Sequence, residues 1–148
     1  MDQKRILIID DEPAMTRMIR LTLEMTKRYQ VREENQAAHA LATAHEFKPD
    51  LILLDVIMPG VDGGELARRI TTDAKLKQVP LIFLTGTVTK KEAAEGAVTA
   101  GHPLLSKPVS LKALVETMEN TFAARAHEQT RPKAGKPAEK PAGPQPGQ

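Results

Sequence analysis

The chain of 148 residues contains no cysteine and no tryptophan, and it has only one tyrosine and three phenylalanines. Without cysteine, disulfide bonds and thiolate metal sites are excluded. Because aromatic residues make up only 3% of the chain, a hydrophobic core has to be built from Ile, Leu, Val, Met and Ala. The length has room for one domain, since domains most often hold roughly 100–150 residues.

Long hydrophobic runs are also missing. No segment approaches the roughly 18 consecutive apolar residues that span a bilayer. The N-terminal MDQKR leads into only four consecutive apolar residues, Ile6 to Ile9, which are too few for a signal peptide. We therefore expect a cytoplasmic protein that does not contact a membrane.

Positive charge is concentrated at one end of the chain. The net charge is +2, but the five basic and two acidic residues from Arg125 onward carry +3, which leaves −1 for the rest. A domain so close to neutrality, with no basic face, is not expected to bind nucleic acid. Residues 128–148 contain no Ile, Leu, Val, Met or aromatic side chain, so burial cannot offset their ordering entropy. We expect a folded domain over residues 1–125 and a disordered tail over residues 126–148, and we leave open whether the basic tail docks to an acidic partner.

Short apolar runs alternate with segments of helical periodicity over residues 1–125. The runs predict five strands, at residues 5–9, 29–33, 51–54, 81–84 and 104–106. In the segments between them, apolar residues recur three or four positions apart, as on one face of a helix. Strands that alternate with helices imply a parallel sheet with helices on both faces.

Helix start signals and apolar faces support this division. The first helix is predicted to begin at Pro13 and to place Met15, Met18, Ile19 and Thr22 on one face. Capping-box spacing predicts helix starts at Asp62 with Glu65 and at Thr89 with Glu92, and Ser110 can cap the last helix.

The composition of the five runs predicts their order in the sheet. The first, third and fourth runs are almost wholly apolar, as in strands covered on both faces. The second run mixes Gln30, Arg32 and Glu33 with apolar residues, and the fifth is short and follows Pro103. These are features of edge strands. The prediction is an α/β fold with a five-stranded parallel sheet of order 2-1-3-4-5.

Polar residues follow the strands at their carboxyl ends, where open α/β sheets bind ligands at the reversal of strand order. They are Asp10 and Asp11 after the first strand, Asp55 after the third, Thr85 and Gly86 after the fourth, and Lys107 and Pro108 after the fifth. One acid alone could end a turn or cap a helix, but three packed carboxylates need a compensating cation. Lys107 is expected to offset part of the charge from the far side of the crevice. An all-oxygen donor set favours Mg²⁺.

Four segments carry a resemblance to a known family. IIDDEP (8–13), LLDVIMPGVDG (53–63), LTG (84–86) and LLSKP (104–108) closely resemble the receiver domain of two-component response regulators. The resemblance covers residues 4 to about 124, in order and with family-like spacing. Receivers have the CheY-like, flavodoxin-like order 2-1-3-4-5, so the predicted topology and the resemblance are not independent. The resemblance implies a signalling phosphoacceptor rather than an enzyme.

The family's functional residues map onto this sequence one by one. The resemblance assigns Asp55 as the phosphoryl acceptor. It assigns Mg²⁺ to Asp10, Asp11, Asp55 and the backbone carbonyl of Ile57. Lys107 is expected to contact the phosphoryl oxygens from the side opposite the metal, and Thr85 to donate its hydroxyl to them.

Other positions are assigned structural or switching roles. Pro59 and Gly63 are interpreted as turn residues after the acceptor, and the resemblance implies a cis bond before Pro108. Glu12 is assigned to the start of the first helix rather than to the site. Receivers commonly carry Tyr or Phe at the position of Leu104, where the ring turns inward as the switch threonine moves, and a leucine cannot reproduce that motion.

We therefore expect a stand-alone receiver that takes a phosphoryl group from a histidine kinase or phosphotransfer protein. Phosphorylation would shift the face formed by the fourth helix, fifth strand and fifth helix, and change binding to an unknown output protein. A phosphorylation-dependent homodimer is left open. Two alternatives also remain: an interaction module independent of phosphorylation, and a Mg²⁺-dependent phosphatase. The phosphatase is disfavoured because Ile57 stands where haloacid-dehalogenase-type enzymes usually carry a second acid.

Overall fold

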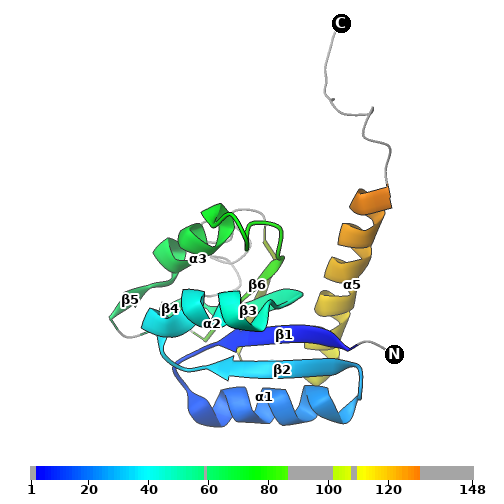
Figure 1. Cartoon of the computed structure of the whole chain (residues 1–148). Coiled ribbons are helices and arrows are strands. Elements are labelled where there is room, and N and C mark those ends of the chain that lie inside the picture. Colours follow the sequence, from blue (N-terminus) through cyan, green and yellow to red (C-terminus); the bar gives the residue numbers. More distant parts are fainter. Residues whose placement is uncertain (1–2, 59, 87–101, 108–109, 131–148) are drawn as a thin grey trace, which may run out of the picture. The chain divides into compact units, whose positions relative to one another are not determined.

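The computed structural model describes residues 3–58, 60–86, 102–107 and 110–130. A five-stranded parallel sheet has the order β2-β1-β3-β6-β7 (Figure 1). Its strands are β1 (Lys4–Ile9), β2 (Tyr29–Glu34), β3 (Leu51–Asp55), β6 (Leu81–Thr85) and β7 (Leu104–Ser106). Counted along the chain, this is the order 2-1-3-4-5, so the predicted fold class and topology are confirmed.

The helices largely follow the predicted segments. They are α1 (Pro13–Met25), a 3₁₀ helix (Ala37–His39), α2 (Ala40–Phe47), α3 (Gly63–Thr72) and α5 (Leu111–Thr130). Ser110 caps α5 as predicted, because its Oγ accepts the N–H of Ala113 at 3.0 Å. The predicted fourth helix, with its Thr89 start signal, lies outside the described residues. Within the described part of the chain, none of these helices is long and apolar enough to span a membrane.

An additional hairpin follows β3. Strands β4 (Ile57–Met58) and β5 (Val61–Asp62) pair in antiparallel fashion. Gly60 in the connecting turn has φ of 71°, a conformation that glycine adopts without steric cost. The sequence analysis predicts only a turn here, because two-residue strands are too short to show periodicity.

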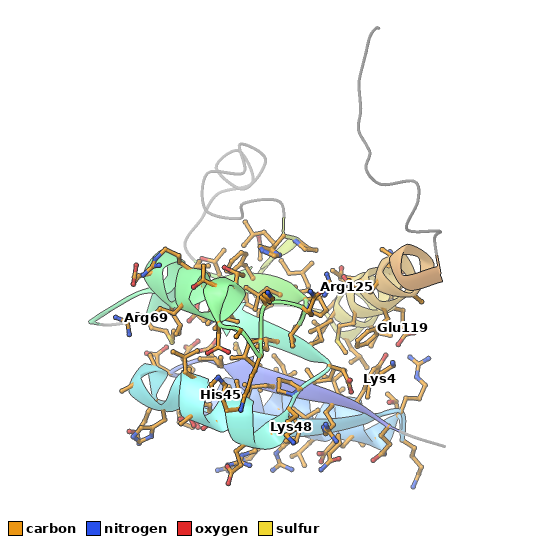
Figure 2. All side chains as sticks on the ribbon, turned by 45° about the horizontal axis from the view of Figure 1, so that its top comes forward. Lys4, His45, Lys48, Arg69, Glu119 and Arg125 are labelled. Atoms are coloured by element: carbon orange, nitrogen blue, oxygen red, sulfur yellow. The ribbon has the colours of Figure 1, made fainter. Side chains whose placement is uncertain are left out.

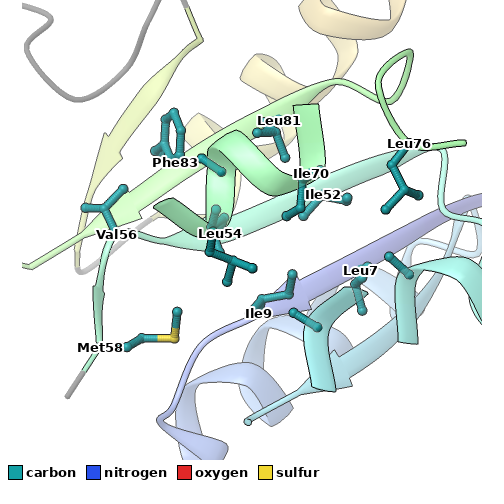
Figure 3. Packing of buried hydrophobic residues seen from close by; sticks show 14 residues of the cluster. Leu7, Ile9, Ile52, Leu54, Val56, Met58, Ile70, Leu76, Leu81 and Phe83 are labelled. Carbon is teal, nitrogen blue, oxygen red and sulfur yellow. The ribbon is translucent and has the colours of Figure 1, made fainter. Parts of the chain in front are cut away.

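Successive side chains along each strand point to opposite faces of the sheet. On one face, Leu7 and Ile9 of β1 pack with Ile52 and Leu54 of β3 and with Phe83 of β6 (Figure 3). Apolar side chains of α2 and α3 complete this cluster, and α1 lies on the other side of the sheet (Figure 1). Every residue of β3 and β6 is buried, so the central strands are covered on both faces as predicted.

The predicted inward face of α1 is partly wrong. The helix buries Thr16, Ile19 and Leu23, whereas Met18 is 57% exposed and Met15 is half-buried. Thr16 can be buried because its hydroxyl has acceptors within hydrogen-bond distance. The helix therefore turns polar Thr16 toward the core, whereas the hydrophobic periodicity predicts Met15 and Met18 on the buried face.

The chain divides into two compact units, Met1–Thr117 and Met118–Gln148, and the boundary falls inside α5. The helix continues to Thr130, beyond the predicted domain end at residue 125, so the first residues of the predicted tail are helical. Residues 131–148 lie outside the described residues, and their disorder stays a prediction.

Candidate functional site

The acids at the carboxyl ends of β1 and β3 meet at one edge of the sheet. The two strands pair in parallel with Ile9 opposite Leu54, so both strands end at the same level of the sheet edge. One carboxylate oxygen from each of Asp10, Asp11 and Asp55 lies within 4.8 Å of the others. The structure therefore brings together the three acids that the sequence analysis places in one crevice.

These three acids differ in exposure. Asp10 is fully buried and Asp55 is 2% exposed, whereas Asp11 is exposed. Asp10 continues β1, because its N–H donates to the Glu34 carbonyl at 3.1 Å. Its Oδ1 also accepts the N–H of Glu12 at 3.0 Å. The sheet thus holds Asp10 inside the site and leaves Asp11 at the solvent side.

Lys107 supplies positive charge to the site. Its Nζ lies 2.7 Å from Asp10 Oδ2 and 3.2 Å from Asp55 Oδ2. The ammonium group therefore lies among the acids, not on the far side of the crevice as expected, because attraction to several carboxylates outweighs the cost of desolvating it. Burial by itself lowers the pKa of Lys107, but hydrogen bonds and charges from the acids raise it above its usual value.

The last two strands position Lys107. Strand β7 pairs with β6 so that Ser106 lies opposite Thr85, and the N–H of Lys107 donates to the Thr85 carbonyl at 2.7 Å. The Lys107 side chain passes Gly86, where an added Cβ would lie 3.7 Å from Lys107 Cδ. Thr85 is fully buried. The residues that carry the hydroxyl and the ammonium group are therefore joined through their main chains.

Asp10 combines burial with incomplete pairing. Burial raises the pKa of its carboxyl group to about 6; Lys107 and the N–H of Glu12 lower it in part, and the charge of Asp55 raises it again. Among the described residues, Asp10 Oδ2 is buried without a hydrogen-bond partner, since its contact with Lys107 lies outside hydrogen-bond geometry. Such an oxygen, close to two more carboxylates, fits the ligand set that a hard divalent cation requires.

The ionised Asp10 carboxylate is expected to destabilise the folded protein when metal ions are absent. Its pKa of about 6 in the folded state lies above the ordinary value of 3.8, so the folded state binds the proton more tightly. The free energy of unfolding should therefore fall as pH rises from about 4 to about 6. We expect Asp10→Asn to remove this fall and to stabilise the protein by about 3 kcal/mol at pH 7. Urea unfolding in EDTA across this range measures it; an unchanged pH dependence in the variant would contradict the explanation.

Glu12 lies closer to the site than the sequence analysis predicts. Its main-chain carbonyl starts α1 by accepting the N–H groups of Met15 and Thr16. Its side chain, however, makes no capping hydrogen bond and places Oε1 3.0 Å from Lys107 Nζ. The run of three consecutive acids was the signal, because a helix cap needs only one short polar side chain.

Asn35 also reaches the site, and the sequence analysis does not name it. Its Nδ2 donates to the main-chain carbonyl of Asp10 at 2.7 Å. Asn35 directly follows β2, the strand next to β1 in the sheet. A polar residue at the carboxyl end of the neighbouring strand was the signal that could have found it.

Gly63 is required for close packing. A Cβ at this position would lie 2.6 Å from Val56 Cα and would also overlap the Val56 carbonyl oxygen. Gly63 begins α3 and has no positive φ, unlike Gly60. Its role differs from the turn geometry that the sequence analysis assigns to it, because the constraint comes from the chain that follows Asp55.

The remaining predicted residues are placed only in part. Ile57 begins β4, and the use of its backbone carbonyl as a metal ligand stays a prediction. Leu104 on β7 is half-buried and packs against the hydrophobic cluster of Figure 3. Pro59 and Pro108 lie outside the described residues, and so does the predicted cis bond.

The candidate metal-binding group among the described residues contains carboxylates only. His45, on α2 (Figure 2), pairs instead with Asp73, whose Oδ2 lies 2.8 Å from His45 Nε2. This pair joins the end of α2 to the residue that follows α3. An all-oxygen set remains the chemistry of the acid cluster, as the sequence analysis predicts.

The fold and the site define a flavodoxin-like α/β domain in which three acids and a lysine meet at the carboxyl edge of a parallel sheet. The chain belongs to the response regulator receiver domain family, whose model matches residues 6–119.

Known proteins resemble the chain over most of its length. It is 33% identical over 120 residues to Protein PilH of Pseudomonas aeruginosa, an alignment that covers 80% of this chain and 98% of PilH. It is 38% identical over 117 residues to the phosphate regulon transcriptional regulatory protein PhoB of the same organism, covering 78% of this chain and 50% of PhoB. A solved CheY-like receiver domain protein from Methanospirillum hungatei JF-1 superposes with a TM-score of 0.74 at 26% identity, covering 86% of this chain and 99% of that one.

Proposed function

We propose that this receiver domain accepts a phosphoryl group on Asp55 in a Mg²⁺-dependent reaction, with a histidine kinase or a phosphotransfer protein as the donor. The observation that carries the proposal is the convergence of Asp10, Asp11 and Asp55, whose ligand oxygens lie within 4.8 Å of one another. Lys107 Nζ stands 3.2 Å from the proposed acceptor. An interaction module that kept only the fold would have no need for this costly arrangement of charge.

Asp55 acts as the nucleophile. One of its carboxylate oxygens forms a bond to phosphorus while the bond between phosphorus and the donor atom breaks, and the electron pair of that bond leaves with the donor. The product is an acyl phosphate on the protein. Because Asp55 is buried at the end of a central strand, the carboxylate is held in a fixed position for in-line attack.

Asp10, Asp11, Asp55 and the backbone carbonyl of Ile57 would hold Mg²⁺. The ion would supply positive charge that neutralises the oxygens of the transferring group. Asp10 contributes a buried oxygen with unused acceptor capacity, and Asp11 contributes a carboxylate from the solvent side. These residues thus provide both a fixed ligand and an accessible one.

Lys107 and Thr85 couple the phosphoryl group to the fold. The Lys107 ammonium contacts the acids in this structure, and it is close enough to Asp55 to bind a phosphoryl oxygen formed there. The hydroxyl of Thr85 provides a further donor from the neighbouring strand. Since the Lys107 N–H is bonded to the Thr85 carbonyl, a shift of either residue is passed to β7 and Leu104. Phosphorylation would bias an existing equilibrium between two conformations of the face that the sequence analysis assigns to partner binding. That bias would change the affinity for the partner.

The direct test is phosphorylation by a small acyl phosphate. With Mg²⁺ present, intact-mass spectrometry should show the addition of one phosphoryl group, and with EDTA in place of Mg²⁺ the mass should not change. Equal labelling in EDTA would contradict the role of the metal. No labelling under either condition, at donor concentrations that modify a receiver of known activity, would contradict the acceptor role.

A further inference from the structure

A chain of hydrogen bonds behind the acids ends on the main chain between Asp10 and Asp11. We propose that Asn35 is a positioning residue for the metal site, because its side chain holds the Asp10 carbonyl and so fixes the direction of both acids. The inference rests on the proposed Mg²⁺-dependent function. It goes beyond that function by naming the residue that sets the geometry of the ligands.

The orientation of the Asn35 amide follows from its partners. Nδ2 lies 2.7 Å from the Asp10 carbonyl oxygen and 3.0 Å from Thr16 Oγ1. A main-chain carbonyl can only accept a hydrogen bond, so the amide group must present its nitrogen and not its oxygen. Both N–H bonds of the amide are then used, and two separate partners fix the plane of the side chain.

Thr16 is a firm anchor for Asn35. It is fully buried, and its hydroxyl lies 2.6 Å from Glu33 Oε1, the shorter of its two acceptor contacts. The other oxygen of Glu33 accepts Arg20 Nε at 2.5 Å. Burial by itself raises the pKa of Glu33, but the hydrogen bonds from Thr16 and Arg20 bring it below its usual value. Glu33 therefore stays an acceptor, and the single hydroxyl proton of Thr16 points toward it while Thr16 accepts from Asn35.

Holding one carbonyl controls two side chains. The carbonyl of Asp10 and the N–H of Asp11 belong to one planar peptide group, so fixing its oxygen fixes its plane. The N–H of Asp10 is bonded to Glu34 at 3.1 Å, and both main-chain groups of Asp10 are thus tied to the end of β2. Asp11 is exposed, so the direction of its side chain depends on this peptide group more than on packing.

Asn35→Asp separates positioning from electrostatics. The substitution keeps the size of the side chain, replaces its two donors by an acceptor, and adds a negative charge close to the acids. The added charge alone would strengthen cation binding, whereas the loss of the hydrogen bond to Asp10 would weaken it. We expect the dissociation constant for Mg²⁺, measured by NMR titration of the full chain with magnesium chloride and no phosphodonor, to rise about tenfold.

The matched control is Gln36→Glu, which adds the same charge at the exposed neighbouring residue. Its affinity for Mg²⁺ should equal or slightly exceed that of the wild type. If Asn35→Asp binds Mg²⁺ as tightly as the wild type, the positioning role is overturned and the proposed function stands. If the wild type itself shows no Mg²⁺-dependent shifts, the proposed function fails first.

A second pair of variants tests the same chain of hydrogen bonds at Thr16, its buried member. Thr16→Val removes the hydroxyl that anchors Asn35, and Thr16→Ser retains it. The dissociation constant for Mg²⁺ should rise in Thr16→Val and return to the wild-type value in Thr16→Ser, with both variants showing the dispersed spectrum of a folded protein. Equal affinities in these two folded variants would overturn the positioning role even if Asn35→Asp does not fold.

Discussion

Replacement of Asp55 by asparagine should abolish phosphoryl transfer to this protein. An amide of nearly the same size fills the same space at the end of β3, but its oxygen is a poor nucleophile and does not form a stable acyl phosphate. The Lys107 ammonium, 3.2 Å from Asp55 Oδ2, should remain in the site, so access to the position changes little, although one negative charge is lost. Intact-mass spectrometry after incubation with a small acyl phosphate and Mg²⁺ measures the outcome.

Asp50→Asn is the matched control for this experiment. It makes the same chemical change just before the same strand, where Asp50 Oδ2 accepts the N–H of Arg5 at 2.7 Å. Because Asp50 lies at the amino end of β3 and Asp55 at the carboxyl end, labelling should stay at the wild-type level. Equal labelling of Asp55→Asn and the wild type would sink the acceptor assignment.

The second large effect is expected for Gly63→Ala, which should lower the free energy of unfolding by about 3 kcal/mol. The new Cβ would lie 2.6 Å from Val56 Cα and overlap the Val56 carbonyl oxygen. Both atoms belong to the main chain, so no side-chain rotation can relieve the contact. Val56 directly follows Asp55 and donates its N–H to the Leu84 carbonyl at 3.1 Å. Relief therefore requires a shift of α3 or of the loop behind the acceptor, and phosphorylation should be slower as well.

Gly60→Ala separates this packing effect from backbone strain. Gly60 has φ of 71°, but a Cβ there would meet nothing within 4 Å. The left-handed conformation should cost an alanine about 1 kcal/mol, clearly less than the clash at Gly63. Urea unfolding of both variants makes the comparison, and equal losses would contradict the explanation from close packing.

Strand order was predictable because the composition of each strand indicates whether the strand is buried on both faces. LILLD of β3 and LIFLT of β6 are almost wholly apolar and are buried on both faces, whereas YQVREE of β2 alternates and lies at the edge. Parallel strands end at a common edge, so the order also predicted that Asp10 and Asp55 meet. The extent of α5 was not predictable in the same way. Its last turns are mostly polar, and a polar segment has no apolar stripe that would reveal a helix in the sequence.

The sequence by itself thus determined which strands are central and which acids converge, since both depend on short-range pattern and on the geometry of parallel strands. Only the tertiary structure decided that Lys107 lies among the acids, that Glu12 contacts it, and that Asn35 holds the main chain of Asp10. These contacts join residues far apart in the chain, and they depend on where long side chains find partners of opposite charge or complementary hydrogen bonding. No local pattern encodes that choice, because the partners become neighbours only after the sheet has formed.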